Sequence, residues 1–216
     1  MRVRLAALAL VVSFGLAGCS GSDASDQVAT DPAGSGGGVS APTAPPAAPG
    51  DVRSRGLITV MDKDVTDDVV ELCLGAIAES YPPQCGGPRI TNWDWDAHQG
   101  FDEQGDVRWG TFAVTGTWDG EEFTVTDAVP GAVYDPMAEE PPTYPEPSTH
   151  YDEGRLIELA EELTGVPGVL GAYGDATSGH VLVDVNYDDG SYQDYADDAY
   201  GEGVVVVTGA LVDVES

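Results

Sequence analysis

Between residues 54 and 129, hydrophobic and polar residues alternate in short runs, which is the period of a half-buried β-strand. Asp119-Gly120 separates the last two runs and predicts a two-residue hairpin turn, with Val114 facing Val125. Phe112, Val114, Phe123 and Val125 then share the inner face. The five predicted strands, which indicate a small closed or nearly closed barrel of the OB or a similar type, cover residues 56–62, 71–80, 89–95, 107–118 and 122–129.

Beyond residue 149 the hydrophobic period changes to that of a helix. Leucines 156, 159 and 163 recur at helical spacing and predict a helix over residues 151–164. Strands at 168–175 and 180–187, an acidic helix at 191–200 and a strand at 204–214 follow. The resulting αββαβ order is ferredoxin-like without its first strand, which the preceding linker or an irregular edge would supply.

Proline divides the chain into these two regions. Of the 15 prolines, 11 fall in residues 32–49 and 130–147, which are also rich in small or acidic residues. We therefore expect a disordered tether at 19–53, a β-barrel-like module at 54–129, a linker at 130–149 and an acidic α+β module at 150–216. The predicted fold class is α+β, with a small mostly-β module placed first.

The N-terminus has the pattern of an export signal. Two arginines precede an apolar run of about thirteen residues, which is too short to cross a bilayer. The run ends at Leu16-Ala17-Gly18-Cys19, which resembles the lipobox of bacterial lipoproteins. This resemblance implies that residues 1–18 are a signal peptide and that Cys19 carries a diacylglycerol anchor at the outer face of the cytoplasmic membrane. The alternative is an ordinary signal peptide followed by a cysteine.

The two other cysteines, Cys73 and Cys85, are twelve positions apart. Disulfides persist outside the cytosol, so this remaining pair predicts a disulfide. A catalytic thiol would need a histidine partner, and a zinc site would need more ligands than His98, His150 and His180 offer. The sequence therefore favours a structural staple.

Charge is the strongest compositional signal, because the chain has 38 acidic residues against 8 basic ones. Loss of the signal peptide leaves 6 basic residues and excludes nucleic acid as a partner. The acidic surface keeps the protein soluble and away from anionic lipid headgroups. The alternative is cation binding, for which Asp188, Asp189 and Asp194 are a candidate weak calcium site. The same segment also has the composition of an Asp-Gly turn, and no other cofactor is expected.

Trp93 and Trp95 form the second candidate site. If residues 89–95 are a strand, both rings project from one face while Asp94 and Asp96 project from the other. Aromatic rings beside carboxylates suit a sugar ligand, and OB-type barrels bind oligosaccharides. The alternative is that both rings belong to the core.

The segments ELCLG, PPQCGGP and NWDW resemble a pattern in uncharacterised secreted and lipid-anchored proteins of actinobacteria. The resemblance covers about residues 56–128 and implies no activity, substrate or catalytic residue. The segments GHVLVDV and AYGEGVVVVTGAL resemble the small α/β pro-segments of secreted bacterial serine proteases, which implies a shape only.

These features favour a membrane-anchored binding or interaction protein of the cell envelope, with a glycan or a protein as its partner. The chain has none of the common hydrolase, metalloprotease or nucleotide-binding motifs, so an enzyme is not favoured. The two alternatives are a hydrolase that cleaves an envelope polymer with paired carboxylates, and a protein-interaction or inhibitory module. A hydrolase predicts an acidic cleft lined by tryptophan with a carboxylate of raised pKa; an interaction module predicts an exposed sheet edge near the C-terminus.

Overall fold

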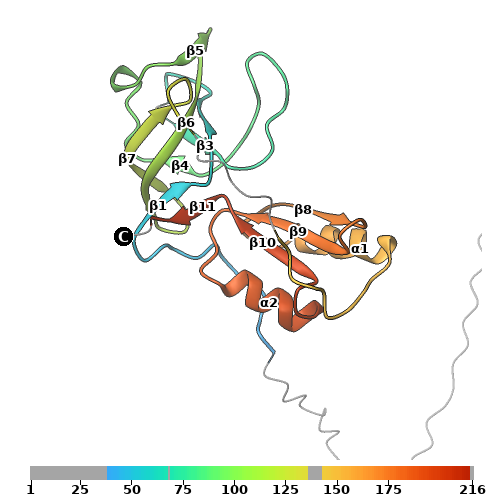
Figure 1. The fold of residues 1–216 in the computed structure, drawn as a ribbon. Coiled ribbons are helices and arrows are strands. Elements are labelled where there is room, and N and C mark those ends of the chain that lie inside the picture. Colours follow the sequence, from blue (N-terminus) through green and yellow to red (C-terminus); the bar gives the residue numbers. More distant parts are fainter. Residues whose placement is uncertain (1–37, 68, 136–142, 215–216) are drawn as a thin grey trace, which may run out of the picture. The chain divides into compact units, whose positions relative to one another are not determined.

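The computed structural model describes residues 38–67, 69–135 and 143–214 (Figure 1). Residues 37–216 form one compact unit. The described part is mostly β-sheet and has two α-helices. The predicted signal peptide and Cys19 lie outside the described residues.

Five strands close into a barrel, which confirms the prediction of a small closed barrel. Each strand pairs with the next, the last pairs with the first, and all pairs are antiparallel except β4 with β7. In ring order the strands are β2 (Ile58–Asp62), β3 (Val70–Cys73), β4 (Arg89–Ile90), β7 (Phe123–Pro130) and β6 (Val107–Trp118).

The barrel closes because its strands are staggered. One row of paired residues runs from Arg108 on β6 through Asp62, Val70 and Ile90 to Phe123 on β7. Phe123 then pairs with Trp118, which lies on β6 ten residues after the start of the row. Such a stagger between strands is the geometric condition for closing a sheet into a barrel.

The inner face of the β6–β7 hairpin agrees with the predicted alternation, since Phe112, Val114 and Phe123 are fully buried. The predicted register is wrong, because Trp118 pairs with Phe123 and the connecting loop has four residues. The Asp119 carboxylate holds this wider loop by accepting the backbone N–H groups of residues 121 and 122 at 2.9 and 2.7 Å.

A bulge at Thr115 and Gly116 shifts the pairing further along the hairpin. A Cβ atom on Gly116 would lie 2.1 Å from the carbonyl oxygen of Thr124, so only glycine fits this position. The register of the hairpin therefore depends on the close approach of the backbones at Gly116 and Thr124. The alternation of hydrophobic and polar residues does not reveal this approach.

Two predicted strands are shorter than expected. The segment at 71–80 leaves the sheet after Cys73, and the segment at 89–95 leaves it after Ile90. The Asn92 side chain then replaces a strand pairing, because its amide donates to the Val125 carbonyl oxygen and accepts the Val125 N–H, both at 2.8 Å. The backbone after Ile90 therefore leaves the sheet while the Asn92 side chain keeps the contact with β7.

The folded region begins earlier than the predicted boundary at residue 54. Strand β1 (Asp51–Ser54) pairs with β6, although its first three residues fall within the predicted tether. Further upstream, the Ala48 N–H donates to the Trp118 carbonyl oxygen at 2.9 Å, and the Trp118 indole donates to that of Pro46 at 2.8 Å. Strand β5 (Phe101–Gln104), which pairs with β6, was also not predicted.

The C-terminal region contains a three-stranded sheet with two helices. Helix α1 packs against β8 and β9, and α2 packs against β10. The strand order is β10-β9-β8, and the additional first strand of a ferredoxin-like order is not among the described strands. The elements are α1 (Glu153–Leu163), β8 (Val169–Asp175), β9 (His180–Val185), α2 (Ser191–Tyr200) and β10 (Val205–Gly209).

The predicted last strand at 204–214 consists of two strands in two different sheets. Strand β10 pairs with β9, whereas β11 (Leu211–Asp213) pairs with β1 beside the barrel (Figure 1). Leu211 is 1% exposed and belongs to the barrel core. The predicted separation into two modules is therefore not confirmed, since the end of the chain completes the sheet of the first region.

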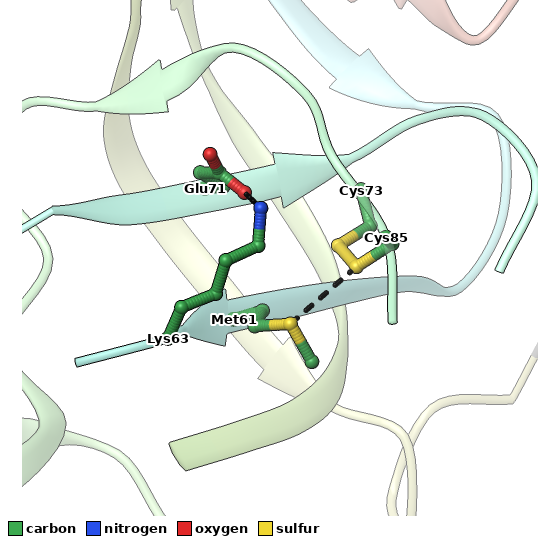
Figure 2. Close-up of a disulfide and its surroundings, with 5 residues drawn as sticks. All are labelled: Met61, Lys63, Glu71, Cys73 and Cys85. Carbon is green, nitrogen blue, oxygen red and sulfur yellow. Dashed lines mark hydrogen bonds and ion pairs between the residues drawn. A yellow bond between two sulfur atoms is a disulfide. The ribbon is translucent and has the colours of Figure 1, made fainter. Parts of the chain in front are cut away.

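The predicted disulfide between Cys73 and Cys85 is present, and the two Cα atoms are 5.8 Å apart. Figure 2 shows the disulfide against Met61, with the Cys85 Sγ and Met61 Sδ atoms 3.7 Å apart. Trp109 completes this small buried cluster. The disulfide thus ties the loop after β3 to the outer side of the barrel.

Candidate functional site at the mouth of the barrel

A cavity of about 330 Å³ lies where one row of residues crosses four barrel strands. Arg108, Asp62, Val70 and Ile90 are successive partners in this row, and all four line the cavity. We call this space the mouth cavity. Its other polar and aromatic lining residues include Arg89, Trp93, Asp94, Trp95 and Asp96.

The segment that carries the two tryptophans is not a strand. Trp95 begins a short 3-10 helix (Trp95–Ala97), and the Asp94 side chain caps it by accepting the Asp96 N–H at 3.0 Å. The predicted division into a tryptophan face and a carboxylate face is therefore wrong. Both tryptophans and both aspartates line the same cavity, because the chain turns at Asp94 and successive side chains no longer point to opposite faces as they would on a strand.

Trp95 belongs to the barrel core and is 6% exposed, whereas Trp93 is half-buried and packs against that core. The two indole rings meet edge to face with their centroids 5.4 Å apart. The Trp93 ring also stacks on the His98 ring, with 4.1 Å between the centroids. Neither indole N–H has a hydrogen-bond acceptor within the described part of the chain. Both indole N–H groups are themselves buried, so the rings have a packing role in this structure, and their role as a ligand platform stays a prediction.

Asp62 is the buried acid of the site, at 4% exposed. Burial raises the pKa of its carboxyl, although the Asp64 N–H, the Trp95 indole and Arg108 act in the opposite direction. The Asp64 N–H donates to Oδ1 at 3.2 Å, while the indole lies outside hydrogen-bonding geometry. Asp62 is thus held in place and protonates more readily than an exposed aspartate.

Two arginines line the cavity, and they differ in their partners. The Arg108 Nε atom lies 2.6 Å from a Glu103 carboxylate oxygen, and this bond raises the pKa of Arg108, as do the nearby charges of Asp62 and Asp96. Arg89 has no ion-pair partner among the residues that the structure describes.

The three aspartates of the candidate cation site lie in the turn before α2 and in its first turn. The Asp188 Oδ1 atom accepts the N–H groups of Gly190 and Tyr192 at 3.0 Å each, and Asp189 accepts that of Ser191 at 3.1 Å. These bonds form the turn that starts α2. Within the described ranges, no three His, Cys, Asp or Glu residues are grouped closely enough to hold a metal ion, and calcium binding at Asp188, Asp189 and Asp194 stays a prediction.

His98 and His180 both contact other residues of the fold. Burial lowers the pKa of His98, which stacks on Trp93, against the opposing charges of Asp94 and Asp127. His180 is buried, with its Nε2 atom 2.8 Å from the Pro145 carbonyl oxygen. Neither imidazole has a described hydrogen bond to a serine or cysteine side chain.

The sequence pointed to Trp93 and Trp95 but not to Asp62, Arg89 or Arg108. A usable signal did exist, because the chain has only 8 basic residues and two of them, Arg89 and Arg108, stand at the start of predicted barrel strands. Recognising that they meet required the strand register, since Arg89 and Arg108 come from β4 and β6.

Comparisons with protein families, with curated proteins and with solved structures find no match to this chain. Among the described residues, no helix has the length and apolar character needed to cross a membrane.

Proposed function

We propose that this chain is a lipid-anchored, non-enzymatic binding protein of the bacterial cell envelope, and that the mouth cavity binds an envelope glycan. One observation carries the proposal: a single cavity gathers two tryptophans, a buried carboxylate and two arginines. Aromatic walls with a few converging polar groups are typical of small-ligand sites, and the volume of about 330 Å³ lies at the lower end of their range.

The assignment of the barrel to the OB type is part of this proposal. OB barrels bind oligosaccharides on the face of their second and third strands and on the adjoining loops. Among the ring strands in chain order, these are β3 and β4, whose residues Val70 and Ile90 line the mouth cavity. Fold analogy supports the ligand class only together with the lining residues.

Binding without catalysis is favoured because the acids of the cavity are engaged in the fold. Asp94 caps the 3-10 helix, Asp62 accepts the Asp64 N–H, and the charge of Asp96 helps to raise the pKa of Arg108. A pair of catalytic carboxylates would need one group that is free to donate a proton and a second that activates water or attacks the sugar.

The test is co-sedimentation of the chain from Ser20 onward with purified cell-wall material. We expect wild-type protein to sediment with the wall and the Trp93→Ala variant to lose at least tenfold in affinity. Trp93→Leu, which keeps apolar volume, separates loss of stacking from loss of packing, and circular dichroism verifies that both variants fold. The matched control is Tyr173→Ala, since Tyr173 is an exposed aromatic on β8. Equal sedimentation of wild type and both Trp93 variants would refute the cavity as the glycan site.

A hydrolase is the second candidate, favoured by the raised pKa of the buried Asp62 beside tryptophans. It predicts that wild-type protein releases reducing ends from wall polymers and that Asp62→Asn does not. The absence of release by wild-type protein across pH 4 to 8 would remove this candidate.

An interaction module is the third candidate, favoured by the position of β8 at the edge of its sheet. Tyr173 on this strand is 57% exposed, and no lysine or arginine follows Arg155, so a basic extended segment would be the complementary partner. A peptide of alternating lysine and valine should shift amide NMR signals of residues 169–175. Shifts spread evenly over the acidic surface would instead indicate non-specific attraction.

A further inference from the structure

The pairing of β3 with β4 gives Arg89 an obvious partner that it does not use. Glu71 lies directly opposite Arg89 in the register, a position where opposite charges normally pair. Instead, Glu71 forms an ion pair with Lys63, as Figure 2 shows. Arg89 lines the mouth cavity and is exposed, and it has no ion-pair partner among the described residues.

The other charged groups of the lining already have partners. Arg108 is bound to Glu103 and faces Asp62 and Asp96, while Asp94 caps the 3-10 helix. Arg89 is therefore the lining charge with capacity for a ligand. Because 6 basic residues stand against 38 acidic ones after residue 18, composition alone does not lead one to expect an arginine that lines a cavity without an anionic partner among the described residues.

We propose that the glycan bound in the mouth cavity carries a carboxylate, and that Arg89 binds this carboxylate with its planar guanidinium. The inference rests on the proposed function, since it names the ligand class of the same site. Guanidinium and carboxylate groups match in a two-bond geometry, and such charge-assisted hydrogen bonds are stronger than neutral ones.

The surroundings of Arg89 favour a carboxylate over a phosphate. Asp62, Asp94 and Asp96 line the same cavity. A phosphate monoester carries about −1.5 to −2 charges at neutral pH, whereas a carboxylate carries one, so the phosphate would meet the stronger repulsion.

The experiment compares two sugars that differ by one carboxylate-bearing group. The full mature chain, in a non-ionic detergent without a sugar headgroup, is titrated at low salt with N-acetylmuramic acid and with N-acetylglucosamine. Intrinsic fluorescence reports binding, because all four tryptophans lie within residues 93–118 of the barrel region. We expect the carboxylated sugar to bind about tenfold more tightly, as expected for one charge-assisted contact. Arg89→Gln should abolish this preference.

The control is Arg155→Gln, which removes the same charge from the exposed surface of α1 and should keep the preference. Equal affinities of wild-type protein for the two sugars, or a preference that survives Arg89→Gln, would overturn the role of Arg89 while leaving the glycan site intact. If neither sugar binds but wall co-sedimentation still depends on Trp93, the carboxylate inference is wrong and the proposed function stands. If co-sedimentation also fails, both are wrong.

Discussion

The barrel region and the sheet-and-helix region that follows it are both strongly acidic, yet they differ in the scarce residue types. The barrel side holds all four tryptophans and, of the six basic residues that follow residue 18, all except Arg155. The C-terminal region holds both α-helices and three buried tyrosines, and several of its carboxylates accept backbone N–H groups. In a chain this acidic, the few basic and aromatic side chains are therefore more informative about a ligand site than the many carboxylates.

The two regions also carry separate spectroscopic probes. Tryptophan fluorescence reports the barrel, and the helical circular dichroism signal reports α1 and α2. If residues 37–216 unfold as one unit, the two probes should follow a single transition in any denaturant.

The largest expected effect on this comparison comes from Leu211→Ala. Leu211 lies on β11 in the barrel core but is separated from β10 by a single residue. Truncating a fully buried leucine should lower the free energy of unfolding by about 3 kcal/mol. Urea unfolding followed by both probes measures this, with coincident midpoints expected. A shift of the fluorescence midpoint alone would mean that the two regions unfold independently.

Loss of the disulfide should have the next largest effect. In the chain from Ser20 onward, the double variant Cys73→Ala, Cys85→Ala should lower the free energy of unfolding by about 3 kcal/mol. The reason is that the unfolded chain gains entropy when the cross-link between residues twelve positions apart is absent. Guanidinium unfolding measures the loss, and wild-type protein treated with a reductant is the matched control. An unchanged midpoint in both samples would contradict a stabilising role for the staple.

Alkaline pH should act through buried tyrosines in both regions, because Tyr187 packs in the barrel core and Tyr192 in the core of the C-terminal sheet and helices. Burial raises the pKa of Tyr187 and Tyr192 to about 12, from an ordinary value of 10. Between pH 10 and 12 the unfolded chain loses these phenolic protons while the folded chain keeps them, so stability should fall as the pH rises through this range. Thermal unfolding at pH 9, 10 and 11 measures the decline, which should be less steep in the Tyr187→Phe variant. Stability that stays flat up to pH 11 would contradict the expected burial.

The smallest effect is expected from Arg155→Gln. Arg155 and Glu158 form an exposed pair one helical turn apart, with nitrogen and oxygen 3.1 Å apart. Exposed pairs of this kind contribute about 0.5 kcal/mol or less, so the urea midpoint should hardly move. A loss of more than about 1 kcal/mol would show that surface charge matters more to this fold than its average acidity suggests.

The elements that were predicted well are long and strictly periodic. Strand β6 and helix α2 have the predicted boundaries, because alternation over twelve residues and the Asp-Gly turn before residue 191 are local signals. Strands β1 and β5 were missed since each has four residues and little apolar alternation. The break between β10 and β11 was missed because a continuous apolar run does not indicate which sheet each half joins.

The candidate site was predicted only in part for the same reason. Trp93 and Trp95 stand out by residue type, but their placement depends on the end of β4 at Ile90 and the Asn92 side-chain bonds that follow. Asp62 looks like an ordinary polar residue at a strand end until the register sets it beside Arg108.

The sequence alone established the disulfide, because only two cysteines remain after Cys19, and it established both helices and the inner face of the long hairpin, because these follow from local period. Closure of the barrel, the entry of β11 into its sheet and the meeting of Asp62, Arg89 and Arg108 at one mouth were decided by the tertiary structure. These features depend on strand register and stagger, which are set by packing between segments far apart in the chain and not by any one segment's own pattern.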